Sequence, residues 1–427
     1  MSDKSKLSTE SYKGVRDFYP EDMFIQKYIF DTWRKTVEKY GYEEYNASIL
    51  EPSEIYKAKS GDEIVNEQTY TFKDRGEREI TLRPEMTPTV ARMVAAKEKE
   101  LAFPLRWYSI PNVFRYEKPQ RGRTREHWQL NVDFFGPNTT EVNTEIITVA
   151  YKIMKNFGAK DEHFIIRLNS RKIMDDLYDH FKLTEEQAQK VSKIIDKKNK
   201  ISNEIFTQSL EEILGKVSEE FIGILSSNER FLETLGEKNK NVSNLIELIE
   251  KLQSIGIKNI VFDTTLMRGF DYYTGTVFEI YDTNPNNSRS LFGGGRFDDL
   301  LDIFGAKKVP TIGFAMGDVT TRDFLETHSL LPKYLPTTRL YICTLSTDFL
   351  EPARKLAEML RIEGVNVSID PSDKKVGDQI KTAHKQNIPY IVCIGEDEIK
   401  SGLYSVKNME SGEETKVKAE EIVNIIK

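Results

Sequence analysis

The stretch RYEKPQRGRTREHWQ, residues 115–129, concentrates positive charge in a chain whose net charge is −7. It holds five cations in fifteen positions: Arg115, Lys118, Arg121, Arg123 and Arg125. A guanidinium stays charged and presents forked donors that match two oxygens at once, which suits a phosphate chain. A solvated surface loop would explain the same charge. The stretch alone therefore leaves a polyanion site and a polar loop both open.

Two strand-like runs flank these cations, PLRWYSIPNVFRYE before them and EHWQLNVDFFG after them, and predict a long-looped antiparallel hairpin. In the second run an apolar set alternates with a polar set: Trp128, Leu130, Val132 and Phe134 against Gln129, Asn131 and Asp133. Successive strand residues point to opposite faces, so we expect one face to meet the core and the other to be polar. Arg115 and Glu117 are expected to converge with the polar set on one surface.

A third polar group lies in RPEMTP, which brings Arg83, Glu85 and Thr87 close together. Thr87 followed by Pro88 predicts a helix that starts there, with Thr87 as its N-cap.

The stretch MRGFDYYTGTVFE adds Arg268 beside Tyr272 and Tyr273 at the start of a predicted strand. Strand alternation puts Arg268 and Tyr272 on one face and Tyr273 on the other, so a site shared by all three needs a bulge or bend. A purely structural cluster of these residues stays an alternative.

Several other classes of site lack their motifs. The run GGGR, residues 293–296, predicts a glycine turn, but neither GxxxxGK[ST] nor a GxGxxG after a strand is present. The histidines have no HExxH or other ligand spacing, and Cys343 and Cys393 lie in apolar strand-like runs, which predicts buried free thiols. We therefore assign no metal ligands to side chains.

Composition places the chain among multi-domain soluble proteins. It has 427 residues, of which 39% are hydrophobic and 30% charged, enough apolar material for two or three cores. The N-terminus has no apolar segment typical of a signal peptide, and no run approaches the roughly 18 apolar residues that span a membrane. We expect a cytoplasmic protein without membrane contact. A pI near 5.6 limits any nucleic-acid contact to local basic surface.

The order of predicted elements divides the chain into five parts. A mixed α+β region is interrupted by a Lys- and Glu-rich helical insertion, then resumes, and a proline-rich linker leads to a small α/β domain that ends with a helix. The predicted boundaries are 1–171, 172–256, 257–328, 329–338 and 339–427.

Taken in order, RPEMTP, FRYEKPQRGRTREHWQLNVDFFG, RGFDYYTGTVFE, GGGRFD and GFAMGD resemble the histidyl-tRNA synthetase family of class II aminoacyl-tRNA synthetases. The resemblance runs from about Gly14 to the C-terminus. It implies an antiparallel sheet flanked by helices as a catalytic domain in two parts, with a helical insertion and a C-terminal α/β anticodon-binding domain. It also implies a homodimer whose partners are L-histidine, ATP with Mg²⁺, and histidine tRNA.

The resemblance also implies roles for the ATP-binding residues. Arg115 would contact the α-phosphate and Arg268 would approach it from the other side, so these two are the implied catalytic residues. Glu117 would contact the adenine end of ATP, and Arg123 the terminal phosphates.

For the amino acid, the resemblance implies a second set of residues. Glu85, Thr87 and Gln129 are similar to the set that binds the ammonium group. Asp133 and Tyr273 match the residues that recognise the imidazole, with Tyr272 beside them in the histidine-binding set.

Four positions depart from the family pattern. Ser48 replaces a proline of the first motif, Asp133 a glutamate, Phe297 a tyrosine and Thr320 an arginine that normally helps to bind ATP. We expect either another cation, such as Arg322, to substitute for that arginine or ATP to bind differently.

Two rival functions remain at this stage. A catalytically inactive regulatory subunit of ATP phosphoribosyltransferase shares the core, but predicts eroded catalytic positions and no anticodon domain. A class II synthetase for proline, threonine or glycine is the other rival, and RGFDYYTGTVFE argues against it.

Overall fold

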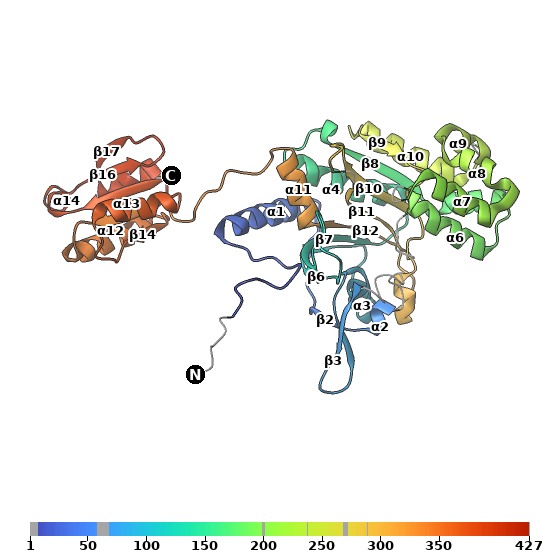
Figure 1. The fold of residues 1–427 in the computed structure, drawn as a ribbon, viewed down its shortest axis with the longest axis horizontal. Coiled ribbons are helices and arrows are strands. Elements are labelled where there is room, and N and C mark those ends of the chain that lie inside the picture. Colours follow the sequence, from blue (N-terminus) through green and yellow to red (C-terminus); the bar gives the residue numbers. More distant parts are fainter. Residues whose placement is uncertain are drawn as a thin grey trace. The chain divides into compact units, whose positions relative to one another are not determined.

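The structure is a computed structural model that describes residues 7–57, 68–198, 201–236, 238–267, 272–287 and 289–426 (Figure 1). Contacts within the chain divide it into two compact units. The larger holds the described residues of Met1–Asp17 and Gln26–Leu331, and the smaller those of Phe18–Ile25 and Pro332–Lys427. No helix in these ranges is both long and apolar enough to cross a membrane.

A nine-stranded sheet forms the centre of the larger unit. In spatial order its strands are β1 (Glu43–Glu44), β5 (Leu105–Ser109), β7 (Glu126–Phe135), β12 (Thr311–Gly317), β11 (Ser290–Arg296), β10 (Thr276–Asp282), β8 (Phe164–Ser170) and β9 (Ile260–Phe262), with β6 (Asn112–Phe114) paired to β7. All neighbours are antiparallel except the edge pairs β1–β5 and β8–β9, which are parallel. The predicted α+β fold and the long-looped hairpin of β5, β6 and β7 are confirmed.

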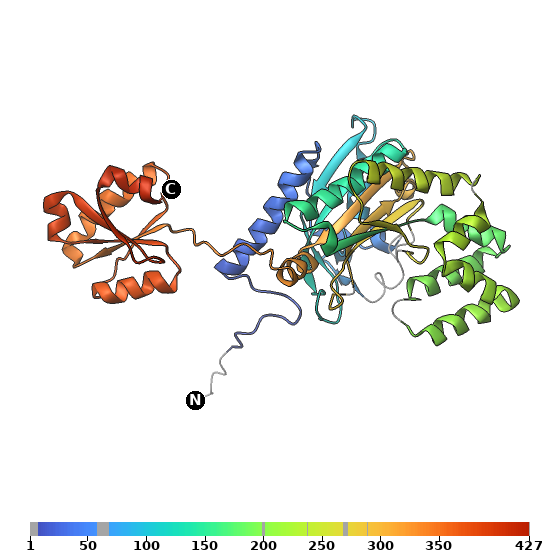
Figure 2. The same ribbon diagram turned by 90° about the horizontal axis from the view of Figure 1, so that it is seen from above.

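Helices cover this sheet and bury their apolar stripes against it. Helix α4 (Thr140–Asn156) begins where the Thr139 side chain accepts a hydrogen bond from the Val142 amide, and it packs on β12. Helix α11 (Asp318–Thr327) packs on β7, β11 and β12. Figure 2 shows α4 beside the long helix α1 (Pro20–Glu38).

A small three-stranded sheet lies next to the start of α3. Its strand order is β2 (Leu50–Pro52), β4 (Glu79–Leu82) and β3 (Tyr70–Lys73), and α2 (Glu54–Lys57) follows β2. Helix α3 (Thr87–Ala96) begins at the predicted residue. The predicted cap is wrong, because Thr87 is already helical and Met86 is the N-cap, without a side-chain hydrogen bond.

The glycine turn predicted at residues 293–296 is wrong, because these residues lie inside strand β11. The reason is close packing between strands. A Cβ atom on Gly294 would lie 2.0 Å from the carbonyl oxygen of Gly313, and one on Gly295 would lie 2.8 Å from the Tyr273 ring. The glycines therefore allow neighbouring backbone and an aromatic ring to approach the strand.

Among the described residues between β8 and β9, where the sequence predicts a helical insertion, there are six α-helices: α5 (Arg171–His180), α6 (Glu185–Asp196), α7 (Asn203–Leu214), α8 (Ser218–Leu225), α9 (Asn228–Leu235) and α10 (Lys240–Ser254). Their buried side chains are mainly apolar and include Phe206, Leu210 and Phe221. The predicted domain boundaries themselves stay a prediction.

The smaller unit contains a five-stranded sheet ordered β14 (Val367–Ile369), β13 (Leu340–Thr344), β15 (Tyr390–Ile394), β16 (Leu403–Asn408) and β17 (Glu414–Lys418). The first three strands are parallel, as the alternating pattern predicts, and α12 (Leu350–Ile362) and α13 (Val376–Lys385) connect them. The antiparallel pair β16–β17, between α14 (Glu396–Ser401) and α15 (Ile422–Ile426), was not predicted. Cys343 and Cys393 are free; Cys343 is buried and Cys393 is partly exposed.

Candidate active site

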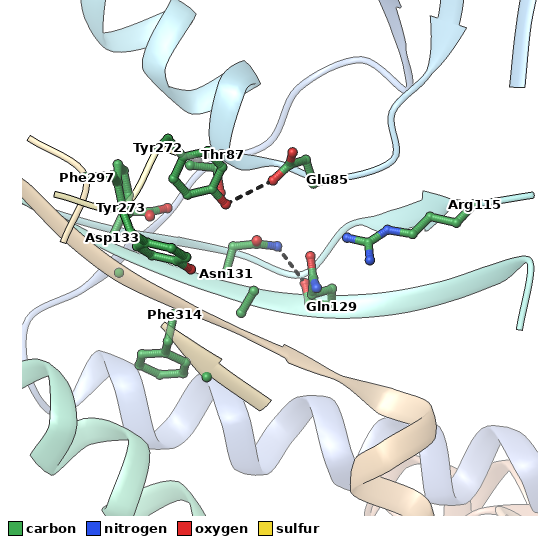
Figure 3. Close-up of a pocket in the computed structure, with 13 residues that line it drawn as sticks. Glu85, Thr87, Arg115, Gln129, Asn131, Asp133, Tyr272, Tyr273, Phe297 and Phe314 are labelled. Carbon is green, nitrogen blue, oxygen red and sulfur yellow. Dashed lines mark hydrogen bonds between the residues drawn. The ribbon is translucent and has the colours of Figure 1, made fainter. Parts of the chain in front are cut away.

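One pocket in the larger unit gathers seven of the sequence-predicted residues: Glu85, Thr87, Arg115, Gln129, Asp133, Tyr272 and Tyr273. Figure 3 shows Asp133 and Arg115 at opposite ends of this pocket, with Asn131 and Gln129 between them. Glu85, Thr87 and Tyr272 lie across from that row. Stretches nearly 190 residues apart in the sequence therefore meet at one site, as in the 3.2 Å hydrogen bond from the Tyr272 hydroxyl to Glu85 Oε2.

Strand β7 supplies the floor of the pocket through its alternation. Its residues Gln129, Asn131 and Asp133 share one face, and they pair in register with Gly317, Ala315 and Gly313 of β12. The expected polar surface is a buried one, because Asn131 and Asp133 are only 3% and 4% exposed.

Gly313 makes the position of Asp133 possible. A Cβ atom on this glycine would lie 2.4 Å from Asp133 Oδ1 and 2.6 Å from the carbonyl oxygen of Val132. Distances this short are not tolerated, so a larger residue at 313 would displace the carboxyl group.

The carboxyl group of Asp133 has an unusual proton affinity. Burial raises its pKa from 3.8 to about 7, and the neighbouring Tyr45 hydroxyl works against this rise. Among the described residues, no cation forms an ion pair with Asp133. The group can therefore change its charge near neutral pH, and it offers an acceptor to a ligand that brings its own N–H donor.

The middle of the pocket presents further acceptors. The side-chain oxygen Oε1 of Gln129 is buried and makes no hydrogen bond with a described residue. Glu85 is 3% exposed, and Thr87 opens helix α3 beside it. A buried carboxylate, an amide oxygen and a hydroxyl form a set of acceptors suited to an ammonium group.

Tyr272 and Tyr273 both line the pocket, with ring centroids 4.9 Å apart. The expected conflict of strand faces does not arise, since β10 begins only at Thr276 and neither tyrosine is in a strand. Arg268 lies outside the described residues.

Arg115 marks the outer end of the pocket. Its Nε donates to the carbonyl oxygen of Pro84 at 2.9 Å, which ties the guanidinium to the segment that precedes α3. Arg83, by contrast, has a structural role, because it donates to the backbone of Ala47 and Asn112 at 2.8 Å each.

The remaining cations of the opening stretch do not line the pocket. Arg123 pairs with Glu117 at 2.8 Å, and Arg121 with Asp323 at 2.9 Å. Arg125 is 9% exposed, and its guanidinium lies 4.0 Å from the centre of the Tyr116 ring.

His127 lies on the same side of β7 as Gln129, by alternation. Burial, together with the charges of Arg115 and Arg16, lowers the pKa of its imidazole to about 3. The ring is thus neutral at physiological pH, beside the outer end of the site. Alternation in the run EHWQLNVDFF was the signal that could have identified it.

Two of the positions that depart from the family pattern, Thr320 and Phe297, and the candidate substitute Arg322 have contacts of their own in the structure. Thr320 lies in the first turn of α11, where its hydroxyl donates to the carbonyl oxygen of Leu291 at 2.8 Å. Arg322 pairs with Glu326 at 2.8 Å. Phe297 lines the pocket and packs edge-on against Tyr272 at 5.7 Å.

The chain is similar to known proteins along nearly its whole length. The family description "Histidyl-tRNA synthetase" matches residues 14–319, and "Anticodon binding domain" matches residues 339–427. Histidine--tRNA ligase of Leptospira biflexa is 42% identical over 96% of this chain and 95% of its own length. The same enzyme of Thermoplasma volcanium is 36% identical, with 96% of each chain covered.

Solved structures agree with the fold. The histidyl-tRNA synthetase of Nostoc sp. PCC 7120 superposes with a TM-score of 0.84 over 99% of both chains, at 24% identity. The apo enzyme of S. aureus gives 0.75 over 98% of this chain and 100% of its own, at 25% identity.

These matches define an aminoacyl-tRNA synthetase, with a sheet-based catalytic fold and a matched anticodon-binding domain. Within that class, the chain belongs to the histidyl-tRNA synthetase family.

Proposed function

We propose that this histidine–tRNA ligase activates L-histidine with ATP in the pocket between Asp133 and Arg115, and then transfers the histidyl group to the 3′ end of histidine tRNA. The observation that carries the proposal is the order of groups along the pocket. Buried acceptors for an amino acid occupy its inner end and middle, and a fixed guanidinium occupies its outer end.

In the first step, a carboxylate oxygen of histidine attacks the α-phosphorus of ATP. An O–P bond forms, the bond to the β-phosphate bridge breaks, and pyrophosphate leaves with that electron pair. The carboxylate is already ionised, so no general base is required. Arg115 stabilises the charge that shifts among the phosphate oxygens.

Histidine is held at both ends by hydrogen bonds. Its ammonium group donates to Glu85, Thr87 and Gln129. Its imidazole reaches toward Asp133 and Tyr273, with Tyr272 packed beside them. An analogue without the ring nitrogens would leave these buried groups unpaired, a loss on the order of 10⁴ in specificity.

The ATP end of the site requires rearrangement of side chains that now pair with each other. Arg123 is proposed to bind the terminal phosphates and Glu117 the adenine end, so the ion pair between them must open or adjust. Mg²⁺ enters with the phosphates as part of the substrate. Arg268 is proposed to reach the α-phosphate from the other side, and Arg268→Ala should lower the adenylation rate far more than histidine affinity.

The family suggests the location, the oligomeric state and the tRNA contacts. We propose a cytoplasmic homodimer, with residues 339–427 contacting the anticodon of histidine tRNA and the helices of residues 172–256 near its acceptor arm. Light scattering of the purified protein should give twice the chain mass of 49.4 kDa. A monomer at micromolar concentration would contradict the dimer.

The regulatory-subunit alternative has weaker support. A structure titled as an ATP phosphoribosyltransferase regulatory subunit/histidyl-tRNA synthetase, from Bacillus halodurans, superposes with a TM-score of 0.74 at 24% identity, a likeness of fold alone. That alternative predicts no anticodon domain, whereas residues 339–427 match one.

The deciding experiment is ATP–pyrophosphate exchange by the purified protein with each of the twenty amino acids. We expect exchange with histidine alone. No exchange with any amino acid would reject the activation step, and exchange with another amino acid would reject the specificity.

A further inference from the structure

Tyr45 lies behind the imidazole end of the pocket, in the segment between β1 and β2. Its backbone amide donates to the carbonyl oxygen of Tyr108 at 2.8 Å. Its ring packs against Trp107 with centroids 5.6 Å apart. Trp107 pairs in register with Asp133, so the side chain of Tyr45 reaches across β5 toward the carboxylate on β7.

The hydroxyl of Tyr45 is buried beside two other polar groups, Asp133 and Ser109. Neither the Tyr45 hydroxyl nor the Ser109 hydroxyl makes a hydrogen bond of normal geometry with a described residue. A buried hydroxyl without a partner is costly, so its retention at this place calls for an explanation. The carboxylate of Asp133 is a charged acceptor that this hydroxyl faces.

The electrostatic surroundings of Asp133 make this hydroxyl important. The Tyr45 hydroxyl favours the ionised carboxylate, whereas burial disfavours it. The charge of Asp133 also acts on Tyr42, but it is the smallest of the effects on that residue, and the Tyr42 hydroxyl donates to Glu145 at 3.2 Å. Arg83 faces Tyr45, but it donates to the backbone oxygens of Ala47 and Asn112 and to the Asn112 side chain. Glu85 and Arg115 lie across and along the pocket.

We propose that Tyr45 is a positioning residue for histidine recognition: its hydroxyl donates to one oxygen of Asp133, so that the other oxygen accepts the N–H of the substrate imidazole. This inference rests on the proposed function of the pocket. It gives a physical role to an aspartate that is one methylene shorter than the glutamate common in the family. The shorter carboxylate is held in place from behind by a rigid aromatic side chain.

The test compares histidine kinetics of wild type and Tyr45→Phe in ATP–pyrophosphate exchange from pH 5.5 to 9. The variant keeps the ring and loses the donor, so less Asp133 is ionised at a given pH. Loss of a hydrogen bond to a charged group shifts the acid limb of kcat/KM for histidine upward by about one pH unit. At pH 7 the KM for histidine should rise about fivefold, while kcat at pH 9 stays unchanged.

Tyr42→Phe is the matched control, since it removes a buried hydroxyl three residues away that donates to Glu145. It should keep the wild-type pH profile. The decisive comparison is a double-mutant cycle with Asp133→Asn, which has no charge to stabilise. In the Asp133→Asn background, Tyr45→Phe should cause no further change in the pH profile of kcat/KM for histidine.

A wild-type pH profile in Tyr45→Phe would overturn the inference. An equal loss of kcat/KM for histidine in the wild-type and Asp133→Asn backgrounds would also overturn it, because the tyrosine would then act on packing alone. Failure of the wild type to exchange with histidine would instead reject the proposed function. Calorimetric titration with histidine at pH 6 and pH 8 then tests Tyr45 directly, without the chemical step.

Discussion

The two ends of the active-site pocket are prepared for their ligands in opposite ways. At the inner end and in the middle, acceptors are buried: Asp133 forms no ion pair with a described residue, and Gln129 Oε1 makes no hydrogen bond with one. Beyond the outer end, where ATP is proposed to bind, the cations Arg121 and Arg123 are exposed and already paired with acids of the same chain. The side chain of Arg123 is 48% exposed beside Glu117, and that of Arg121 is 59% exposed beside Asp323.

This difference reflects how each end gains its specificity. Unpaired buried groups cost stability, but they are in place before a ligand arrives. A ligand that fails to pair with them binds more weakly, because they stay buried without a partner. Exposed ion pairs are worth only about 0–1 kcal/mol, so they exchange readily for phosphate oxygens. The pocket is therefore rigid and selective toward the amino acid, and adaptable toward ATP.

Arg115 marks the outer end of the pocket, and its loss should have the largest effect. Arg115→Ala removes the guanidinium proposed to stabilise the reacting phosphate, and the adenylation rate should fall by about 10²–10³-fold. Single-turnover formation of the adenylate measures this, with Lys118→Ala as a control in the same stretch. A rate near wild type would remove Arg115 from the chemical step.

The rigid inner end should be sensitive to one added methyl group. In Gly313→Ala, the new Cβ would lie 2.4 Å from Asp133 Oδ1, so the carboxylate must move. A misplacement of about 1 Å can cost 10²-fold, and we expect the KM for histidine to rise by about that factor. Gly377→Ala, where nothing lies within 4 Å, is the matched control and should leave histidine kinetics unchanged. Unchanged kinetics in Gly313→Ala would show that the inner end is adaptable too.

The cost of keeping Asp133 in the rigid end should appear in stability measurements. Its folded-state pKa of about 7 lies above the ordinary 3.8, so the folded protein holds this proton more tightly than the unfolded chain. The resulting destabilisation is absent near pH 4, grows as pH rises, and is complete above about pH 7. Asp133→Asn should therefore raise Tm at pH 8 by about 2–4 °C or more, while weakening histidine binding.

Thermal unfolding of both proteins from pH 4 to pH 8 measures this effect. The two melting curves should approach each other toward pH 4. A variant that is less stable than wild type at pH 8 would contradict the assigned direction of the pKa shift.

The sequence was sufficient to predict the inner end because alternation along one strand determines it. Gln129, Asn131 and Asp133 share a face in any strand with this pattern, and the family motifs identify Glu85 and the tyrosine pair. Tyr45 could not be found in this way. Its role depends on the pairing of β1, β5 and β7, in which a parallel edge strand brings residue 45 next to residue 133.

The outer end was harder to predict, because charge in a sequence does not show which carboxylate neutralises it. Charge alone does not distinguish Arg121 from Arg123, yet Arg121 pairs across 202 residues with Asp323 and Arg123 pairs with Glu117, six residues away. Arg125 looked like a surface cation and is instead buried against Tyr116. The glycines of β11 were wrongly predicted to form a turn for a related reason, because close approach between strands depends on partners far along the chain.

The smallest expected effect lies at the adaptable end. Asp323→Asn removes the acid that pairs with Arg121, which frees a cation beside the ATP-binding loop. An exposed pair contributes up to about 1 kcal/mol, so the KM for ATP should fall by no more than about fivefold. Salt screens exposed charges, and the difference should fade between 0.05 and 0.5 M, because the screening length drops from roughly 14 Å to roughly 4 Å over this range. A large rise in the KM for ATP would mean that the Arg121–Asp323 pair holds the loop in a binding-competent form. Preorganisation would then extend to both ends of the pocket, and the contrast between them would be one of exposure alone.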